Sequence, residues 1–358
     1  ISKAAMEKGI HVYVQKPLTH NVKEARMLSE LAKKNKIVTQ MGNQGASNPE
    51  QKMIQKWIKD GRIGKVSTVY TWTNRPVWAQ GSPMPSPDPT QKPDGMDWDL
   101  WIGPAKNNGY TPGLHAFSWR GYWDYGTGSL GDMGCHIMDV PIKALGMFEP
   151  YSIEASVPRV PYVGDYTPAP VYDDSCPPSS YVTYKFRPSK LNDSQVKLVW
   201  MDGGLRPSHP DIITDKDDIG ENGVLMFGEN GLIWCDNYGI NARLYIKGQK
   251  GAVEIGKISE INAVEFGHQK FWVDAIKEGY GGKKYKNLTS NFDFAGPLSE
   301  IVLLGNAAIR SSLLKRSARS NVFIGKKQLL YDNKNMVITN LDKANQFLTR
   351  DYRSGWEI

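Results

Sequence analysis

Short apolar runs alternate with amphipathic stretches over the first part of the chain. Residues 10–14 and 37–41 form two largely apolar runs of strand length. Between them, Asn21 precedes apolar positions spaced three or four residues apart, which predicts a capped helix. Strand, helix and strand at this spacing predict a βαβ crossover with parallel strands. A helix over 49–61 and a strand over 66–72 are expected to follow.

The hydrophobic pattern changes after residue 72. Residues 75–115 are rich in Pro, Gly, Trp and Asp and show no period, which indicates a long irregular segment that shapes a binding site or an interface. Helical spacing returns over 129–145, and two further helices are expected near 264–278 and 297–315. Alternating stretches predict a second, largely antiparallel sheet with strands at 151–157, 180–187, 195–200, 223–228 and 231–235. The expected fold class is therefore α/β.

Size and composition narrow the possible partners. The chain has 358 residues, 40% hydrophobic and 23% charged, which suits two domains or one large α/β domain. Its net charge of +7 is not concentrated, because paired lysines occur only as isolated doublets, so no nucleic-acid partner is expected. No apolar run reaches the roughly 18 residues that span a bilayer, so no membrane partner is expected either. The three cysteines form no CxxC pair, which argues against a disulfide framework or a zinc knuckle.

The first candidate for chemistry is Lys16, at the end of the first predicted strand. Ligands of parallel sheets bind beyond the carboxyl ends of the strands, where Gln15, Lys16 and Pro17 fall together with Asn43 and Gln44. Pro17 has a fixed φ and no N–H, so it turns the chain out of the sheet. A lysine at this edge can stabilise an alkoxide-like oxygen in a transition state. The alternative is a solvated surface lysine.

Asp132 and His136 are the second candidate pair. They are four residues apart, so on a helix they lie on one face. A histidine, with an ordinary pKa of about 6.5, suits proton abstraction near neutral pH, and an aspartate can hold its tautomer. The alternative is a surface ion pair or a hydrogen-bonded core histidine. A metal site is not expected, because Cys135 and His136 point about 100° apart on a helix and no second cluster of ligands lies nearby.

Trp119 and Arg120 immediately precede that helix. An aromatic face stacks on sugar rings and nicotinamides, and an arginine binds phosphate or ribose oxygens. Packing is the competing explanation for the aromatic residues of this segment.

Several motifs, taken together, resemble the glucose-fructose oxidoreductase / inositol dehydrogenase / MocA (Gfo/Idh/MocA) family, and especially a branch abundant in Bacteroidetes. The motifs lie at residues 9–18, 61–66, 98–104, 119–121, 131–139 and 304–306. The resemblance implies a Rossmann domain that binds NAD or NADP. It also implies a C-terminal α/β domain whose large, mostly antiparallel, open-faced sheet contacts a sugar or cyclitol substrate and forms a homo-oligomer, a dimer or tetramer.

The same resemblance assigns roles to residues. Lys16, Asp132 and His136 match the family's catalytic lysine, carboxylate and histidine, and Trp119 and Arg120 match a pair near the nicotinamide. The predicted cofactor-binding set comprises Gln15, Lys16, Pro17, Asn43, Gln44, Trp119 and Arg120. Residues 1–45 are then a remnant of the Rossmann domain, and residues 46–358 form the substrate-binding and oligomerisation domain.

Two departures from the family pattern change the expectation. Gln15 replaces the usual glutamate, which removes a charge beside Lys16. The glycine-rich phosphate-binding turn and the acidic residue that binds the ribose are absent from the sequence. Residues 1–358 alone are therefore expected to bind NAD(P) weakly or not at all and to be inactive by themselves.

The leading functional prediction is an NAD(P)-dependent oxidoreductase acting on a hydroxyl carbon of a sugar, glycoside or cyclitol. In it His136 takes the hydroxyl proton, Lys16 steadies the oxygen, Asp132 orients His136, and hydride passes to the nicotinamide. One alternative is a glycosidase that oxidises its sugar transiently with bound NAD. The other is a sugar-sensing module without turnover.

Overall fold

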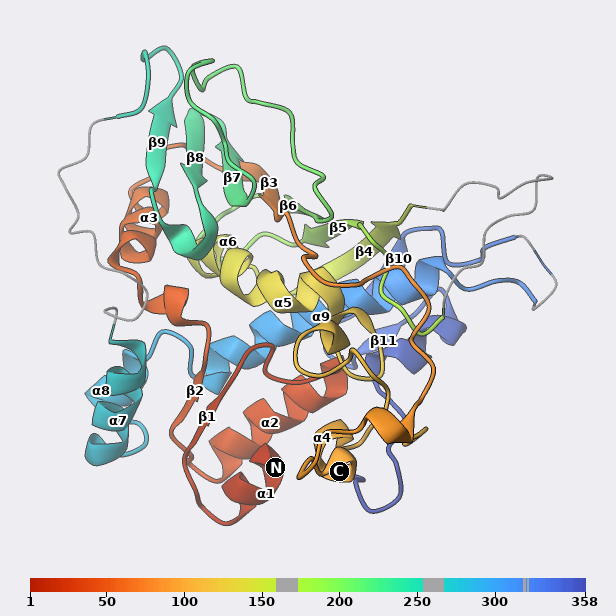
Figure 1. Cartoon of the computed structure of the whole chain (residues 1–358). Helices are drawn as coiled ribbons and strands as arrows, with labels where there is room; N and C mark the ends of the chain where they lie inside the picture. Colours follow the sequence, from red (N-terminus) through yellow and green to blue (C-terminus); the bar gives the residue numbers. More distant parts are fainter. Residues whose placement is uncertain (159–172, 254–266, 318–319, 321) are drawn as a thin grey trace.

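The first part of the chain forms a small parallel βαβ unit. In the computed structural model, which describes residues 1–158, 173–253, 267–317, 320 and 322–358, α1 (Ser2–Glu7) and β1 (Val12–Val14) lead into α2 (Val22–Lys34) and β2 (Thr39–Met41). The two strands pair in parallel, which confirms the predicted crossover. They lie at the lower left of Figure 1, with α2 beside them.

Local sequence explains where α2 begins and how it is held. The Asn21 side chain accepts a hydrogen bond from the Glu24 N–H at 3.0 Å, and the Glu24 carboxylate accepts one from the Asn21 N–H at 3.2 Å. This reciprocal cap pairs N–H groups that the helix itself leaves free. Further along, the Arg26 guanidinium donates two hydrogen bonds, at 2.7 and 2.6 Å, to Glu300 on the long helix α9 (Phe292–Ser312). The βαβ unit is thereby joined to the rest of the molecule.

The segment after β2 crosses to the main sheet and then becomes irregular. It contains η1 (Gln44–Ser47), α3 (Pro49–Lys59), β3 (Val66–Trp72), η2 (Pro89–Gln91), α4 (Trp98–Ile102) and η3 (Ser118–Gly121). The helix and strand predicted over 49–61 and 66–72 are confirmed. The excursion over 75–115 is mostly irregular as expected, but α4 was not predicted. It is only five residues long, too short to show a period, and its cap is Asp97, which accepts a hydrogen bond from the Leu100 N–H.

Among the described residues, nine strands form the main sheet, in the order β11-β10-β4-β5-β6-β3-β7-β8-β9. Besides β3 they are β4 (Pro150–Ser156), β5 (Tyr181–Phe186), β6 (Val196–Met201), β7 (Gly223–Gly228), β8 (Gly231–Cys235), β9 (Arg243–Ile246), β10 (Leu329–Asp332) and β11 (Val337–Ile338). Every described neighbouring pair except β3 and β6 is antiparallel, which confirms the largely antiparallel sheet. The short strands β9, β10 and β11, which lie at or next to the two edges of the sheet, were not predicted.

Helices cover one face of this sheet. The helical stretch expected over 129–145 is two helices, α5 (Gly128–Ile137) and α6 (Asp139–Leu145), which meet at Met138. Together with α9 they run beneath the sheet in Figure 1. Among the described helices α9 is the one long and apolar enough to cross a membrane, yet 83% of that apolar stretch is buried, as in the core helix of a globular fold.

Four further helical segments complete the described part of the chain. They are η4 (Asn237–Gly239), α7 (His268–Glu278), α8 (Lys283–Lys286) and η5 (Asp342–Leu348). Helix α7 corresponds to the helix expected near 264–278, of which residues 264–266 lie outside the described ranges. The short α8 was not predicted.

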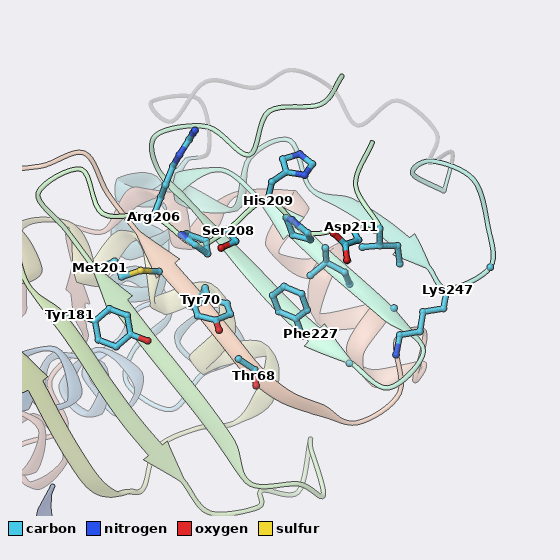
Figure 2. Close-up of a pocket in the computed structure, with 17 residues that line it drawn as sticks. Thr68, Tyr70, Tyr181, Met201, Arg206, Ser208, His209, Asp211, Phe227 and Lys247 are labelled. Atoms are coloured by element: carbon cyan, nitrogen blue, oxygen red, sulfur yellow. The ribbon is translucent and has the colours of Figure 1, made fainter. Parts of the chain in front are cut away.

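The opposite face of the sheet carries its own, smaller cluster. On β7, Val224 and Met226 belong to the main core, whereas Leu225 points the other way and packs with Ile213 and Ile219. Residues 203–222 therefore cover part of this outer face. Beside them lies an open pocket of about 1010 Å³, floored by side chains of the central strands such as Tyr70 and Phe227 (Figure 2). The half of the face formed by β4, β5 and β10 has no such cover among the described segments.

Candidate active site

Lys16 reaches from the carboxyl end of β1 to the first turns of α5. Its Nζ donates a hydrogen bond to Asp132 Oδ1 at 2.8 Å and a second one to the Asp132 backbone carbonyl. Both side chains are more than four-fifths buried. Two residues separated by more than a hundred positions in the chain thus form one ion pair at the place where parallel strands bind ligands.

Arg120 completes this charged group. Its Nε lies 3.6 Å from Asp132 Oδ1, so one carboxylate serves two cations. The guanidinium lies 4.6 Å from the ring centres of both Trp119 and Phe117 and 6.0 Å from that of Trp78, and Nη1 donates to the Phe117 carbonyl at 3.0 Å. Aromatic faces attract a cation held at such distances. Arg120 is therefore held in place before any ligand arrives.

A cavity of about 480 Å³ opens over these groups. Pockets of this size hold small molecules and nucleotide fragments. The lining residues offer a cationic edge, an aromatic wall and several hydroxyl or backbone groups: Gln15, Lys16, Pro17, Thr19, His20, Trp119, Arg120, Tyr125, Gly126, Thr127, Gly128 and Asp132. Five of the seven residues predicted to bind cofactor therefore surround one space.

His136 lies one helical turn beyond Asp132 on α5 and is not among the lining residues of that cavity. Only 5% of its surface is exposed, and its Nδ1 has no hydrogen-bond partner in the described structure. Burial, followed by the charges of Lys16 and His268, lowers the pKa of His136 well below its usual value. The imidazole is therefore neutral near pH 7 and able to accept a proton.

The expected hydrogen bond between Asp132 and His136 is not found among the described residues. The Asp132 carboxylate is directed to Lys16 and Arg120 instead. The ring of His136 makes its contact with Tyr238, whose ring centre is 4.7 Å away at an interplanar angle of 78°. Asp132 therefore fixes the lysine, and a tyrosine ring contacts the histidine.

Asn43 and Gln44 do not line the cavity. Asn43 is fully buried: its Nδ2 donates to Asp139 Oδ2 at 2.9 Å and to the Cys135 carbonyl at 3.3 Å, and its Oδ1 accepts from Ser290. The Asn43 amide thus links the end of β2 to α5 and α6, and it holds these elements together without lining the cavity. Gln44 is half-buried at the start of η1.

Two residues that sequence reasoning did not select lie at the site. His20 lines the cavity, its two ring nitrogens are buried beside the backbone of Trp123 and Gly126, and burial lowers its pKa to about 3. Tyr238 contacts His136 from η4, which follows β8. Proximity to Lys16 in sequence could have indicated His20. Tyr238 carries no signal beyond a turn-forming Asp-Asn-Tyr-Gly sequence.

Cysteines and metal ligands take no part in the described site. Cys135, Cys176 and Cys235 are buried free thiols, and burial raises the pKa of Cys135 to about 12. Over the ranges that the structure describes, no three His, Cys, Asp or Glu side chains are grouped so as to hold a metal ion.

Comparison with known proteins assigns a family to part of the chain. Residues 48–159, which include Arg120, Asp132 and His136, match the Gfo/Idh/MocA model described as "Oxidoreductase family, C-terminal alpha/beta domain". No curated protein matches the sequence.

Solved structures show the same fold at low identity. An NAD-binding oxidoreductase from Klebsiella pneumoniae is 16% identical with a TM-score of 0.54, over 87% of this chain and 74% of that one. An oxidoreductase domain protein from Kribbella flavida is 19% identical with a TM-score of 0.53, over 87% and 74%. Levoglucosan dehydrogenase, solved with NADH and levoglucosan, is 16% identical with a TM-score of 0.54, over 86% and 75%. The chain thus has the fold of these oxidoreductases, and its residues 48–159 match the C-terminal α/β domain of the Gfo/Idh/MocA oxidoreductase family.

Proposed function

We propose that the protein is an NAD(P)-dependent oxidoreductase that moves hydride between a hydroxyl-bearing carbon of a sugar, glycoside or cyclitol and nicotinamide. The observation that carries this proposal is the meeting of Lys16 and Asp132 at 2.8 Å beside a 480 Å³ cavity, with a buried, neutral His136 one turn away. The family match over residues 48–159 and the fold shared with levoglucosan dehydrogenase support it.

The three side chains divide the chemistry. As the alcohol is oxidised, its hydroxyl proton passes to the neutral imidazole of His136. The Lys16 ammonium donates to the oxygen, which carries increasing negative charge until the carbonyl forms. Asp132 holds Lys16 in place and lies close to Arg120, whose position the surrounding aromatic rings fix. Little reorganisation of these side chains is therefore needed during the reaction. In the reverse direction the same groups return the proton.

The cavity suits the nicotinamide end of the cofactor. Trp119 offers a flat aromatic face, and Arg120 offers a fixed cation. These residues, with Gln15 and Pro17, would hold that end. When bound, NAD(P) supplies the acceptor for the hydride. In this proposal residues 1–45 belong to the cofactor-binding domain and residues 46–358 to the substrate domain.

Oligomer formation belongs to the same proposal. The uncovered outer face and edge of the main sheet present exposed apolar side chains, among them Tyr181 on β5, Leu330 on β10 and Val337 on β11. Exposed apolar groups gathered on one sheet face mark interaction surfaces. We propose that two copies of the chain associate through this face.

The test is a turnover assay with the protein expressed from its complete gene. It is mixed with NAD or NADP and a panel of aldoses, methyl glycosides and cyclitols, and the near-ultraviolet absorbance of the reduced nicotinamide is followed. We expect reduction with at least one member of the panel and, in His136→Ala, a loss of about 10²- to 10⁴-fold, the usual contribution of a general base. Release of free sugar from a glycoside without net reduction would instead identify the NAD-dependent glycosidase. Neither activity with any substrate would contradict the proposal.

A further inference from the structure

Tyr238 stands at the reaction centre although it belongs to a distant part of the chain. It lies in η4, directly after β8, and its ring meets the His136 ring edge to face at 4.7 Å and 78°. Burial and the charge of Asp132 raise the pKa of the Tyr238 hydroxyl, while Arg75 opposes the shift. The Tyr238 hydroxyl has no hydrogen-bond partner among the described residues, and the side chain is only half-buried.

The backbone around Tyr238 is held in an unusual conformation. Its φ is 61° and its ψ is 7°, a left-handed geometry that bulky residues seldom adopt and that persists only where the surroundings enforce it. Its carbonyl accepts hydrogen bonds from Asn48 Nδ2 at 3.2 Å and Gln51 Nε2 at 3.4 Å. Gly45 permits the close approach, because a Cβ there would lie 2.6 Å from Tyr238 Cβ. Three residues around α3 thus direct this tyrosine toward α5.

A packing role alone does not explain a tyrosine at this position. Phenylalanine would make the same ring contact with His136 but would carry no hydroxyl. A half-buried hydroxyl without a protein partner is available to a ligand.

We propose that Tyr238 is a positioning and specificity residue: its ring fixes the orientation of His136, and its hydroxyl donates a hydrogen bond to a substrate hydroxyl next to the reacting carbon. This inference rests on the proposed function. The ring and the hydroxyl have separate roles in this proposal, and different substitutions remove them. Tyr238→Phe removes only the hydroxyl, and Tyr238→Ala removes the ring as well.

The first experiment does not depend on turnover. Imidazole resonances of His136 are followed by NMR, in the protein expressed from its complete gene, for the wild type, Tyr238→Phe and Tyr238→Ala, over a pH titration. We expect the ring-current shift of His136 and its resistance to protonation to persist in Tyr238→Phe. In Tyr238→Ala the shift should vanish, and the pKa of His136 should rise by at least one unit as water enters. Unchanged resonances in Tyr238→Ala would overturn the positioning role.

The second experiment tests the hydroxyl. The probes are the best substrate among D-glucose, D-galactose and myo-inositol, together with its monodeoxy analogues. A site built to bind a hydroxyl rejects an analogue that lacks it, because a buried polar group is then left unpaired. We expect the wild type to reject one analogue at least tenfold in kcat/KM. In Tyr238→Phe that preference should disappear, with KM for the parent raised at least tenfold and kcat within about threefold. Equal losses for every analogue, or no change, would overturn the specificity role.

Tyr70→Phe is the matched control, because Tyr70 is also a half-buried tyrosine but lies on the outer face of the sheet (Figure 2). It should leave both readouts unchanged. Absence of turnover in the wild type with every probe contradicts the proposed function and the hydroxyl's role together. The NMR titration then still decides whether Tyr238 positions His136.

Discussion

At the scale of single residues, the site depends on where one carboxylate is directed. Asp132 binds Lys16 and lies close to Arg120, and His136 is left neutral by burial beside a positive charge. A protonated imidazole there would place a third cation in a poorly solvated space. The residue types therefore suit a reaction in which a neutral base gains a proton as negative charge develops on an oxygen bound by lysine.

A pH profile tests the state of His136. Because its pKa is well below 6.5, the base form is already complete at pH 6.5. We expect kcat/KM to change little from about pH 6 to about pH 8 on account of this group and to fall only at more acidic pH, as the lowered pKa is passed. The measurement is the initial rate at low substrate across that range. An inflection at about 6.5 that is lost in His136→Gln would show an unperturbed, solvated histidine instead.

Most residues of the candidate site could be predicted from the sequence alone, and those that could not were missed for physical reasons. Lys16, Asp132 and His136 stand in motifs with recognisable spacing, so they could be selected. The hydrogen-bond partner of Asp132 could not be predicted from sequence, because the choice between Lys16 and His136 depends on the angle at which α5 meets β1. Tyr238 could not be selected either, since only tertiary packing on Gly45 and α3 brings it to His136.

At the scale of elements, glycines let α5 approach α9 closely. A Cβ on Gly134 would lie 3.0 Å from both methyl groups of Val302 on α9, and one on Gly305 of α9 would lie 2.5 Å from Leu130 Cδ2 on α5. Contacts this short force neighbouring side chains or backbone to move. The position of Asp132 and His136 relative to Lys16 therefore depends on the absence of a side chain at Gly134, two residues from each of them.

Gly134→Ala tests this dependence. We expect it to lower the free energy of unfolding by about 1–3 kcal/mol through overpacking, and to lower kcat/KM as α5 shifts. Val302→Ala, which removes the two methyl groups, supplies the matched background. In the double variant the loss from Gly134→Ala should shrink, so that the two changes are coupled by about 0.5–3 kcal/mol. Urea denaturation of the four proteins measures the cycle, and strict additivity would show that this contact does not set the helix spacing.

The prediction of elements succeeded where length or patterning was strong. Helix α2, with its complete cap and apolar stripe, and the central strands with alternating burial were predictable. The strands β9, β10 and β11 have two to four residues, and α4 and α8 have four or five, so none is long enough to repeat a period clearly. The break between α5 and α6 falls at Met138, and Pro141 accounts for it, because proline has no N–H to donate to the Ile137 carbonyl four residues earlier.

At the scale of the whole molecule, buried imidazoles link folding to pH. His20, His136 and His268 all have lowered pKa values, to about 3 for His20 and about 4 for His268. The unfolded chain, with ordinary values near 6.5, then binds more protons than the folded one below that pH. Their contributions to stability are complete above about pH 6.5 and are lost as the pH falls toward the folded values.

Acid unfolding tests this linkage at His268, which is fully buried and held by the Ser47 hydroxyl at 2.7 Å and the Met41 carbonyl at 2.8 Å. A shift from about 6.5 to about 4 corresponds to about 3 kcal/mol of stability lost between those pH values. We expect His268→Gln to be less stable at pH 7 and to show a shallower loss of unfolding free energy over that interval. Urea denaturation at several pH values measures both, and an unchanged slope would contradict the assignment.

The central claim is that Lys16, which follows β1, and His136, which lies on α5, act on the same substrate atom. Groups that act together in one transition state have non-additive effects on rate. The decisive measurement is a double-mutant cycle of kcat/KM for sugar oxidation with the wild type, Lys16→Met, His136→Ala and the double variant. We predict that each single change costs about 10²-fold or more and that the double variant is little worse than the poorer single one. Near wild-type rates in either single variant, or losses that multiply in the double variant, would contradict a shared reaction centre.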